Sequence, residues 1–256
     1  MKKGNVQDKE AENKFFSKIY SANSSNFNPD DSIVIDQISN ILPTGGRILE
    51  AGCGMGHFGK VLAAKGYDCI GVDLSPQAIK KINGDGTSGN KYVALEGDLE
   101  NKDLFEPRTF DLILAPTILH HFPDLSNSRV INNLFYWLSD NGFCVIYEPN
   151  GTNCINKISS FLGSIFLKFG IYDIKTSNEK NHSFFDYKKF FNTAGFLYVE
   201  GRSSTPAEPI EKNSKNSRLL RLMIGIRFVL YKLSNNILPF PFGGGVLLLT
   251  FKKFKK

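Results

Sequence analysis

Residues 48–56 read ILEAGCGMG, in which a short apolar run ends in the acid Glu50 and continues into three alternating glycines. Glycine adopts backbone angles that other residues avoid, and its missing side chain lets a ligand approach the backbone closely. In open α/β sheets, ligands bind at the carboxyl ends of the strands. The segment therefore predicts a ligand-binding turn between a strand over 47–50 and a helix over 57–65.

On both sides of this turn, short apolar runs alternate with amphipathic helical patterns. Such alternation is typical of βαβ units, so we expect a doubly wound, Rossmann-like α/β fold with a mostly parallel sheet. The expected strands cover 47–50, 67–72, 92–95, 110–115, 143–147, 196–200 and 246–252. The expected helices cover two parts of 15–42, then 57–65, a segment opened by Ser75-Pro76, a segment capped at 124 or 126 and closed at 141–142, then 155–169, 183–194 and 217–233.

The composition is that of a globular protein, with 256 residues of which 41% are hydrophobic and 22% charged. The four cysteines fall in no metal-ligand spacing, so we expect reduced thiols, no metal site and a cytoplasmic protein. No uncharged apolar run approaches the roughly 20 residues that span a bilayer, and we expect no transmembrane segment. The formal net charge is +6, and the lysines near the C-terminus, which include Lys252 and Lys253, are expected to be solvated tail residues.

Two kinds of cofactor fit the glycine turn. Residues 54–59 match the dinucleotide pattern G-x-G-x-x-G. Glu50 argues against a pyrophosphate, because a carboxylate at the mouth of the turn repels phosphate and suits a ligand with an ammonium and a sulfonium. Asp73 ends the second strand, where it can accept both ribose hydroxyls of either cofactor. Asp98 follows the third strand and can accept from an adenine amino group, so the three acids predict a slot for a cationic nucleoside.

Four motifs occur in the order and spacing of a known family. They are E-x-G-x-G-x-G at 50–56, V-D-L-S at 72–75, G-D-L at 97–99 and F-D-L-I-L at 110–114. Over roughly residues 45–150 the chain resembles the class I S-adenosylmethionine-dependent methyltransferases, and residues 118–122 (ILHHF) are similar to the small-molecule branch. The resemblance implies a seven-stranded sheet whose last strand is antiparallel, with helical insertions that form a substrate lid.

The resemblance also implies S-adenosylmethionine as the cofactor. The glycines of the turn pass under its methionine part, and Glu50 holds the loop and the amino group. Asp73 binds the ribose, Asp98 with Leu99 frames the adenine, and Ala115 lines the cofactor beside the methyl group. The cofactor-binding residues implied in this way are Glu50, Gly52, Cys53, Gly54, Gly56, Asp73, Leu74, Asp98, Leu99 and Ala115.

His120 and His121 follow the fourth strand and are the candidate catalytic residues. Methyl transfer from a sulfonium is an in-line displacement, and a base is needed only if the nucleophile must lose a proton. Histidine suits that role near neutral pH, although one or both rings can instead be structural. On the catalytic interpretation, His121→Ala lowers the turnover number and leaves cofactor affinity unchanged. Glu148 closes the fifth strand and either bonds a polar substrate group or only terminates the strand.

The helical pattern over about 217–233 allows three interpretations. Its polar residues share one face with leucine, isoleucine and phenylalanine opposite, and Arg227 points into the apolar face. The segment is a half-buried core helix, a lid over an apolar substrate in which Arg227 meets a carboxylate or phosphate, or a basic amphipathic helix on a membrane surface. In the last case residues 217–238 and the basic C-terminus make a peripheral membrane contact. The polar face holds Ser214, Arg218, Arg221, Gly225, Lys232 and Asn236.

The chain divides into an N-terminal tail with helices (1–44), a cofactor-binding core (45–150), and the rest of the same sheet (151–256) with helical insertions at about 153–170 and 212–238. We expect an O- or N-methyltransferase that acts on a small molecule, such as a sugar or a lipid-like metabolite. The alternatives are an NAD-dependent oxidoreductase and a non-catalytic S-adenosylmethionine-binding partner subunit. Residues 115–117 (Ala-Pro-Thr) lack the Asn/Asp-Pro-Pro-Tyr pattern of nucleic-acid methyltransferases, which argues against a nucleic-acid substrate.

Overall fold

The computed structural model describes residues 9–10, 31–84, 92–122, 125, 129–158, 179–205 and 218–254 of the chain. At residue 31 and over residues 218–224 the structure describes the backbone only. The helix expected before residue 31 lies outside these residues, as do most of the loop expected over 83–90 and most of the helix expected over 155–169.

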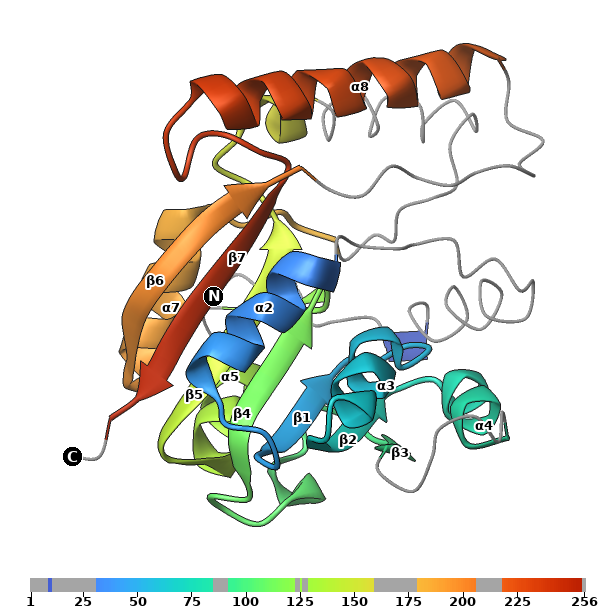
Figure 1. Cartoon of the computed structure of the whole chain (residues 1–256), viewed down its shortest axis with the longest axis vertical. Coiled ribbons are helices and arrows are strands. Elements are labelled where there is room, and N and C mark those ends of the chain that lie inside the picture. The colour runs from blue at the N-terminus through green and yellow to red at the C-terminus, as the bar shows by residue number, and fades with distance from the viewer. Residues whose placement is uncertain are drawn as a thin grey trace, which may run out of the picture.

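Seven strands form one sheet at the centre of the chain (Figure 1). They are β1 Arg47–Ala51, β2 Asp68–Asp73, β3 Tyr92–Glu96, β4 Phe110–Pro116, β5 Leu138–Pro149, β6 Phe196–Ser204 and β7 Val246–Lys253. Their spatial order is β3-β2-β1-β4-β5-β7-β6, and β7 runs antiparallel to both of its neighbours, β5 and β6. The predicted α/β fold with an antiparallel last strand is therefore confirmed.

Helices cover both faces of the sheet (Figure 1). α2 (Asp31–Ile41), α3 (His57–Ala64) and α4 (Pro76–Gly84) share one apolar core with the sheet, while α5 (Arg129–Trp137) and α7 (Phe184–Ala194) share the other. α8 (Arg218–Ile237) lies across the end of the molecule towards which β4 and β5 run. Within the described residues, no helix combines the length and apolarity needed to cross a membrane.

The ends of α7 follow from local sequence signals. The Ser183 hydroxyl accepts from the Asp186 N–H at 3.1 Å, and the Asp186 carboxylate accepts from the Ser183 N–H at 2.9 Å. This capping box satisfies N–H groups that the first helical turn leaves unpaired. Gly195 ends the helix with a φ of 102°, which residues with side chains rarely adopt.

Two strands are longer than the sequence pattern predicts. The helix expected to close at 141–142 ends at Trp137, and β5 begins at Leu138, which lies opposite Phe110 of β4. β6 continues to Ser204, which lies opposite Val246 of β7. Residues without a strand pattern of their own join the sheet in both places because the neighbouring strand supplies partners for their backbone groups.

The lysines near the C-terminus are not all solvated. β7 extends to buried Lys253, whose Nζ donates to the carbonyl oxygens of Phe135 at 2.8 Å and Leu138 at 2.6 Å. Burial lowers the pKa of Lys253, and its donors satisfy carbonyl groups at the end of α5. The expected tail is therefore wrong for this residue. β7 also begins beside α8 and ends at the opposite side of the molecule, so Lys253 and α8 do not share the single membrane face that the sequence suggested (Figure 1).

Candidate active site

Three glycines with positive φ build the turn after β1. Gly52, Gly54 and Gly56 have φ values of 71°, 50° and 69°, which side chains disfavour. The N–H groups of Gly52 and Cys53 both donate to the carbonyl oxygen of Val72, at 2.8 and 2.9 Å. The turn is therefore fixed to the tip of β2, at the carboxyl edge of the sheet.

The turn also abuts the loop that follows β4. A Cβ atom added at Gly52 would lie 2.5 Å from the side chain of Ile118. Real Cβ atoms do not approach other atoms so closely, so the absence of a side chain at Gly52 permits this contact. The histidines that follow Ile118 in sequence consequently belong to the same edge as the glycine turn.

Glu50 lies beneath the turn and not at its mouth. It is 1% exposed, and its carboxylate accepts from the N–H groups of Phe58 at 3.3 Å and Gly59 at 3.0 Å and from the Tyr92 hydroxyl at 2.7 Å. Burial raises the pKa of Glu50 to about 7, although these hydrogen bonds oppose the rise. The expected position at the mouth is therefore wrong. Glu50 ties the turn to the first turn of α3, and its contact with the cofactor amino group stays a prediction.

Tyr92 is a residue of the site that the sequence patterns did not indicate. A Cβ atom at Gly56, Gly59 or Gly71 would lie 2.5, 2.1 or 2.3 Å from the Tyr92 side chain. The tyrosine ring therefore fills the space that three glycines leave between α3, β2 and β3. The glycine spacing that matched the dinucleotide pattern at 56 and 59 serves this packing. A tyrosine at the start of the third strand, with glycines at those positions, is the signal that could have revealed it.

Asp73 joins the tip of β2 to the turn. One carboxylate oxygen accepts from the Gly54 N–H at 2.8 Å and the other from the Ser75 N–H at 2.9 Å. An ionised carboxylate has about four acceptor sites, so this geometry leaves acceptor capacity for ribose hydroxyls. Burial raises the pKa of Asp73, while the bonds from Ser75 and Gly54 and the nearby His121 oppose the rise. The predicted ribose contact is compatible with these bonds and stays a prediction.

Four other predicted cofactor-binding residues are covered to different degrees. Cys53, Leu99 and Ala115 are buried, and Leu74 is half-buried. Burial raises the pKa of the Cys53 thiol, which keeps it protonated and unreactive. Leu99 and Ala115 lie in the apolar core that the sheet shares with α5 and α7. Cofactor contact by these four residues stays a prediction.

Asp98 is paired with a lysine from the N-terminal part of the chain. The Lys9 Nζ lies 2.5 Å from one Asp98 oxygen and 2.6 Å from a Glu100 carboxylate oxygen. The other Asp98 oxygen accepts from the Glu100 N–H at 2.9 Å. Each Asp98 oxygen therefore has a partner within the protein, and the contact of Asp98 with adenine stays a prediction. Sequence patterns gave no sign of this pair, because 89 residues separate its members.

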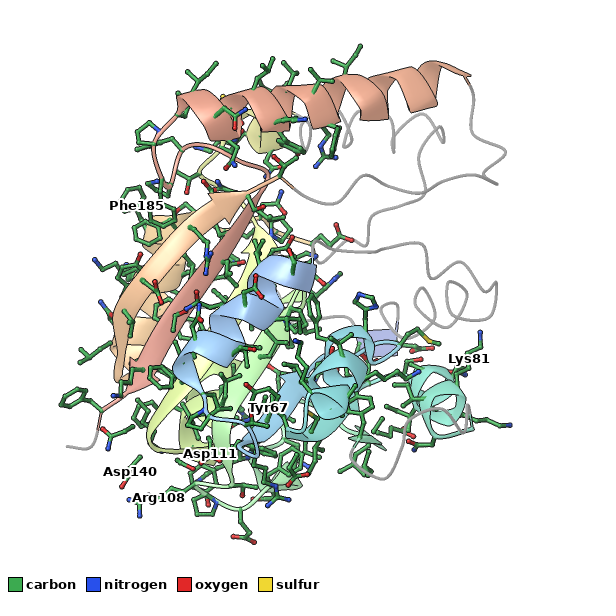
Figure 2. All side chains as sticks on the ribbon, viewed as in Figure 1. Tyr67, Lys81, Arg108, Asp111, Asp140 and Phe185 are labelled. Atoms are coloured by element: carbon green, nitrogen blue, oxygen red, sulfur yellow. The ribbon has the colours of Figure 1, made fainter. Side chains whose placement is uncertain are left out.

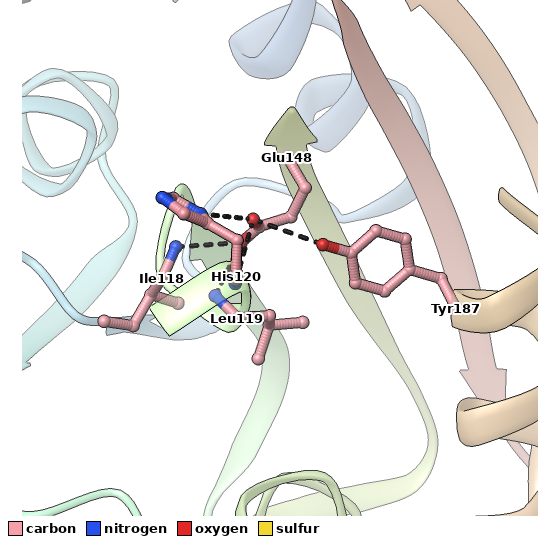
Figure 3. Close-up of polar contacts among 5 residues, drawn as sticks. All are labelled: Ile118, Leu119, His120, Glu148 and Tyr187. Atoms are coloured by element: carbon pink, nitrogen blue, oxygen red, sulfur yellow. Dashed lines mark hydrogen bonds and ion pairs between the residues drawn. The ribbon is translucent and has the colours of Figure 1, made fainter. Parts of the chain in front are cut away.

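Glu148 organises the loop after β4 (Figure 3). Its fully buried carboxylate accepts from the backbone N–H groups of Ile118 at 2.8 Å, Leu119 at 2.7 Å and His120 at 3.3 Å. The Tyr187 hydroxyl donates to it from 3.4 Å. Glu148 thus has a role that neither sequence interpretation included, since it fixes the loop that carries the histidines.

The two histidines have different surroundings. His120 Nδ1 lies 2.8 Å from the Glu148 carboxylate (Figure 3). Because an ionised carboxylate only accepts, this network assigns the proton to Nδ1 and leaves Nε2 as an acceptor in the neutral ring. The His121 ring lies against the His120 ring, with centroids 4.1 Å apart, and interacts with Asp73 on the cofactor side. Both histidines are buried.

Three asparagines after β5 hold the start of β7 and α8. The side-chain amides of Asn150, Asn153 and Asn156 donate to carbonyl oxygens within 241–245 at 2.8 or 2.9 Å. Arg227 donates to the Asn156 side-chain oxygen at 3.2 Å and to the Tyr231 hydroxyl. These contacts place Arg227 in the attachment of α8, and its predicted role in substrate binding stays a prediction. The N-x-x-N-x-x-N spacing was an available signal for the cluster.

A doubly wound sheet, a glycine turn at its carboxyl edge and an acid bonded to that turn define a protein that binds a nucleoside-containing cofactor. A family model described as a methyltransferase domain matches residues 32–199, which is more than half of the chain. The chain belongs to this family, the class I S-adenosylmethionine-dependent methyltransferases. The predicted family is therefore confirmed, and S-adenosylmethionine is the cofactor that the assignment supports.

Individual relatives match parts of the chain. An S-adenosyl-L-methionine-dependent Diels-Alderase of Talaromyces variabilis is 27% identical over 169 residues, which cover 63% of this chain and 56% of that protein. A ubiquinone biosynthesis O-methyltransferase of Xylella fastidiosa is 33% identical over 92 residues, which cover 35% of this chain and 37% of that protein. The matches thus span about half or less of these relatives.

The fold is shared with solved structures of low sequence identity. One is a phosphoethanolamine N-methyltransferase 2 of Haemonchus contortus in complex with S-adenosyl-L-methionine. The likeness has a TM-score of 0.61 at 14% identity and covers 88% of this chain and 52% of that chain. At this identity the likeness concerns the fold.

Proposed function

We propose that this chain transfers the methyl group of S-adenosylmethionine to a hydroxyl oxygen of a small-molecule acceptor. The observation behind this choice is the His120–Glu148 pair on the loop that touches the glycine turn. A neutral amine attacks with a lone pair that is already available, whereas a hydroxyl becomes a good nucleophile by losing its proton to a base. The O-methyltransferase named among the relatives supports the same choice.

The residues at the turn fit S-adenosylmethionine. Residues 50–56 contain no lysine or arginine that would favour a pyrophosphate. Asp73 retains acceptor capacity beside the turn. When bound, S-adenosylmethionine supplies an electrophilic methyl group on a sulfonium.

His120 is the proposed base. Its Nε2 would accept the proton of the acceptor hydroxyl, which would leave that oxygen ready to take the methyl group that S-adenosylmethionine supplies. Glu148 keeps the ring proton on Nδ1 and stabilises the positive ring that forms. The N–H groups of residues 118–120 fix Glu148, so the pair is oriented before the acceptor binds. His121 is a positioning residue between this pair and the cofactor side.

A methylation assay with labelled donor tests the proposal on a panel of phenols, catechols, lipid-like alcohols and amines. We expect O-methyl product with release of S-adenosylhomocysteine. His120→Ala should lower the turnover number about 10²- to 10⁴-fold and leave the affinity for S-adenosylhomocysteine within about threefold of wild type. His121→Ala should lower the turnover number by a smaller factor. Wild-type turnover in His120→Ala would remove the base from the mechanism. In calorimetry, binding of NAD without binding of S-adenosylmethionine would overturn the assignment.

A second candidate is a reaction in which the sulfonium is bound and not consumed. The Diels-Alderase named among the relatives supports keeping it. The same assay separates the two, because this reaction forms product without release of S-adenosylhomocysteine. Tight donor binding without any product would favour the non-catalytic partner subunit.

A further inference from the structure

α8 turns an apolar stripe away from the protein. Side chains project from its outer side, on the far side from the sheet (Figure 2). The exposed apolar residues recur at intervals of three and four, which places them on one helical face. They are Ile226 (51% exposed), Val229 (54%), Leu230 (43%), Leu233 (50%) and Ile237 (74%). Leu238 and Phe242, which follow the helix in sequence, are also exposed.

Over residues 227–234 of α8, polar side chains face the rest of the protein. Tyr231 and Ser234 are buried, and Ser234 accepts from the Asn153 amide at 3.2 Å. Arg227 and Tyr231 bond to the Asn156 side chain. A helix on a water-soluble protein normally buries its apolar face. In α8 the apolar face is exposed instead. The interpretation as a half-buried core helix is therefore wrong about which face is buried, and the outer face suits an apolar environment.

The charge of α8 favours an anionic lipid surface over a second copy of the chain as the partner of this face. The helix contains Arg218, Arg221, Arg227 and Lys232 and no acidic residue. Two copies packed along this face would bring like charges together, whereas anionic lipid headgroups would complement them. An apolar stripe flanked by basic residues is typical of helices that lie in the plane of a membrane surface.

We propose that α8 is an interfacial helix that docks the chain on an anionic lipid bilayer. The stripe enters the boundary between headgroups and acyl chains. Lys232 and the basic positions 218 and 221 lie on the flank of the stripe that meets the headgroups, whereas Arg227 bonds inward to Asn156. α8 lies across the end of the molecule towards which β4 and β5 run, so the bilayer faces the same end as the candidate site (Figure 1). The proposal does not depend on which acceptor is methylated.

Vesicle flotation tests the proposal with the full chain. We expect wild-type protein to float with phosphatidylcholine vesicles that contain about 30 mol% phosphatidylglycerol, and much less with phosphatidylcholine alone. Salt at about 1 M should weaken the binding, because it screens the headgroup attraction. The double variant Val229→Glu/Leu233→Glu should bind at least about tenfold more weakly, since it places two charges in the stripe.

A matched control carries the same charges elsewhere. Val93 and Leu95 of β3 are 51% and 42% exposed, so Val93→Glu/Leu95→Glu changes net charge equally on another element. We expect this control to float like wild type, and both double variants to keep the wild-type circular dichroism spectrum. Equal binding by the two double variants would overturn the proposal. The proposal would also be overturned if wild-type protein did not bind anionic vesicles, formed a dimer in sedimentation, and became monomeric in the Val229→Glu/Leu233→Glu variant.

Discussion

The two halves of the carboxyl edge are held together in different ways. On the side of β1 and β2, Glu50 and Asp73 bond to backbone groups 2 to 19 residues away. On the side of β4, β5 and β7, Glu148 bonds to the loop at 118–120 and Asn150 to residues 241–244, which are 28 to 94 residues away. Apart from the Tyr92 hydroxyl, which bonds to Glu50 from 42 residues away, the carboxylates of the first half bond to neighbouring residues. The second half exists only when distant segments have met.

This difference predicts where single substitutions do most harm. A residue that joins distant elements controls the position of each, so its loss should disturb both the loop and the chemistry. A residue in the glycine turn should act mainly on cofactor affinity. The following substitutions test that contrast, and a matched pair near the C-terminus extends it to stability.

Glu148→Ala should have the largest effect. It leaves three backbone N–H groups and His120 without their buried acceptor, which should cost about 3–5 kcal/mol of unfolding free energy. We expect turnover to fall at least about 10³-fold, because the histidine loop is no longer fixed. Urea unfolding and single-turnover kinetics measure the two effects. Glu148→Gln keeps the side-chain shape, and full turnover in that variant would show that the loop needs no carboxylate.

Gly52→Ala should weaken cofactor binding about 10- to 100-fold. The added Cβ meets Ile118 at 2.5 Å, and the φ of 71° strains any residue with a side chain. Calorimetry with S-adenosylhomocysteine measures the loss. Ile118→Ala in the same chain should recover the part due to the contact and not the part due to φ. Gly225→Ala is the control, because its added Cβ meets nothing within 4 Å, and reduced affinity there would point to a nonspecific effect.

Glu50 should make stability depend on pH. Its pKa is raised from 4.5 to about 7 in the folded state, so the folded protein holds a proton that the unfolded chain releases. The resulting stabilisation is full below about pH 4.5 and is lost as pH rises through about 7, with a magnitude of about 3 kcal/mol. Glu50→Gln cannot titrate and should flatten this part of the curve. Urea midpoints between pH 5 and 8 test it, and parallel curves for the two proteins would contradict it.

Lys253→Met should have the smallest effect, about 1–2 kcal/mol of unfolding free energy, since two buried carbonyl oxygens lose a charged donor. Lys252→Met is the neighbouring control. Lys252 lies over the Phe143 ring at 5.1 Å, a contact that methionine partly keeps, so we expect a change within about 0.5 kcal/mol. Thermal melts of both variants compare the residues, and equal shifts would show that Lys253 is an ordinary surface lysine.

The sequence allowed prediction of the fold and of the glycine turn at the carboxyl edge of the sheet, because their signals are local. The glycines of the turn and the acids at or just after the strand ends, Asp73 and Asp98, each lie within a few residues of what they determine. Tyr92 was missed because its ring fills a space left by glycines on other elements, which a sequence pattern around Tyr92 does not show. Glu148 was assigned no role in the loop for the same reason, since its partners lie about 30 residues earlier.

An amphipathic pattern also does not show which face of a helix packs against the protein. The pattern over α8 identified which residues share a face, but it contained no information on the direction in which that face points. The direction depends on Asn153 and Asn156, which attach the polar side of the helix to the segment after β5. For the same reason β5 begins earlier than its own residues indicate, since β4 supplies the pairing at Leu138.

The position of β7 between β5 and β6 has a consequence for synthesis. Among the described strands β6 pairs only with β7, and 41 residues, 205–245, lie between the two in sequence. At about 5–20 residues per second, β6 leaves the ribosome several seconds before β7 does. Leu197 and Val199 are half exposed even in the finished fold, so the nascent chain presents an apolar, unpaired edge during that interval. We expect chaperones that bind exposed apolar segments to bind β6 during that interval.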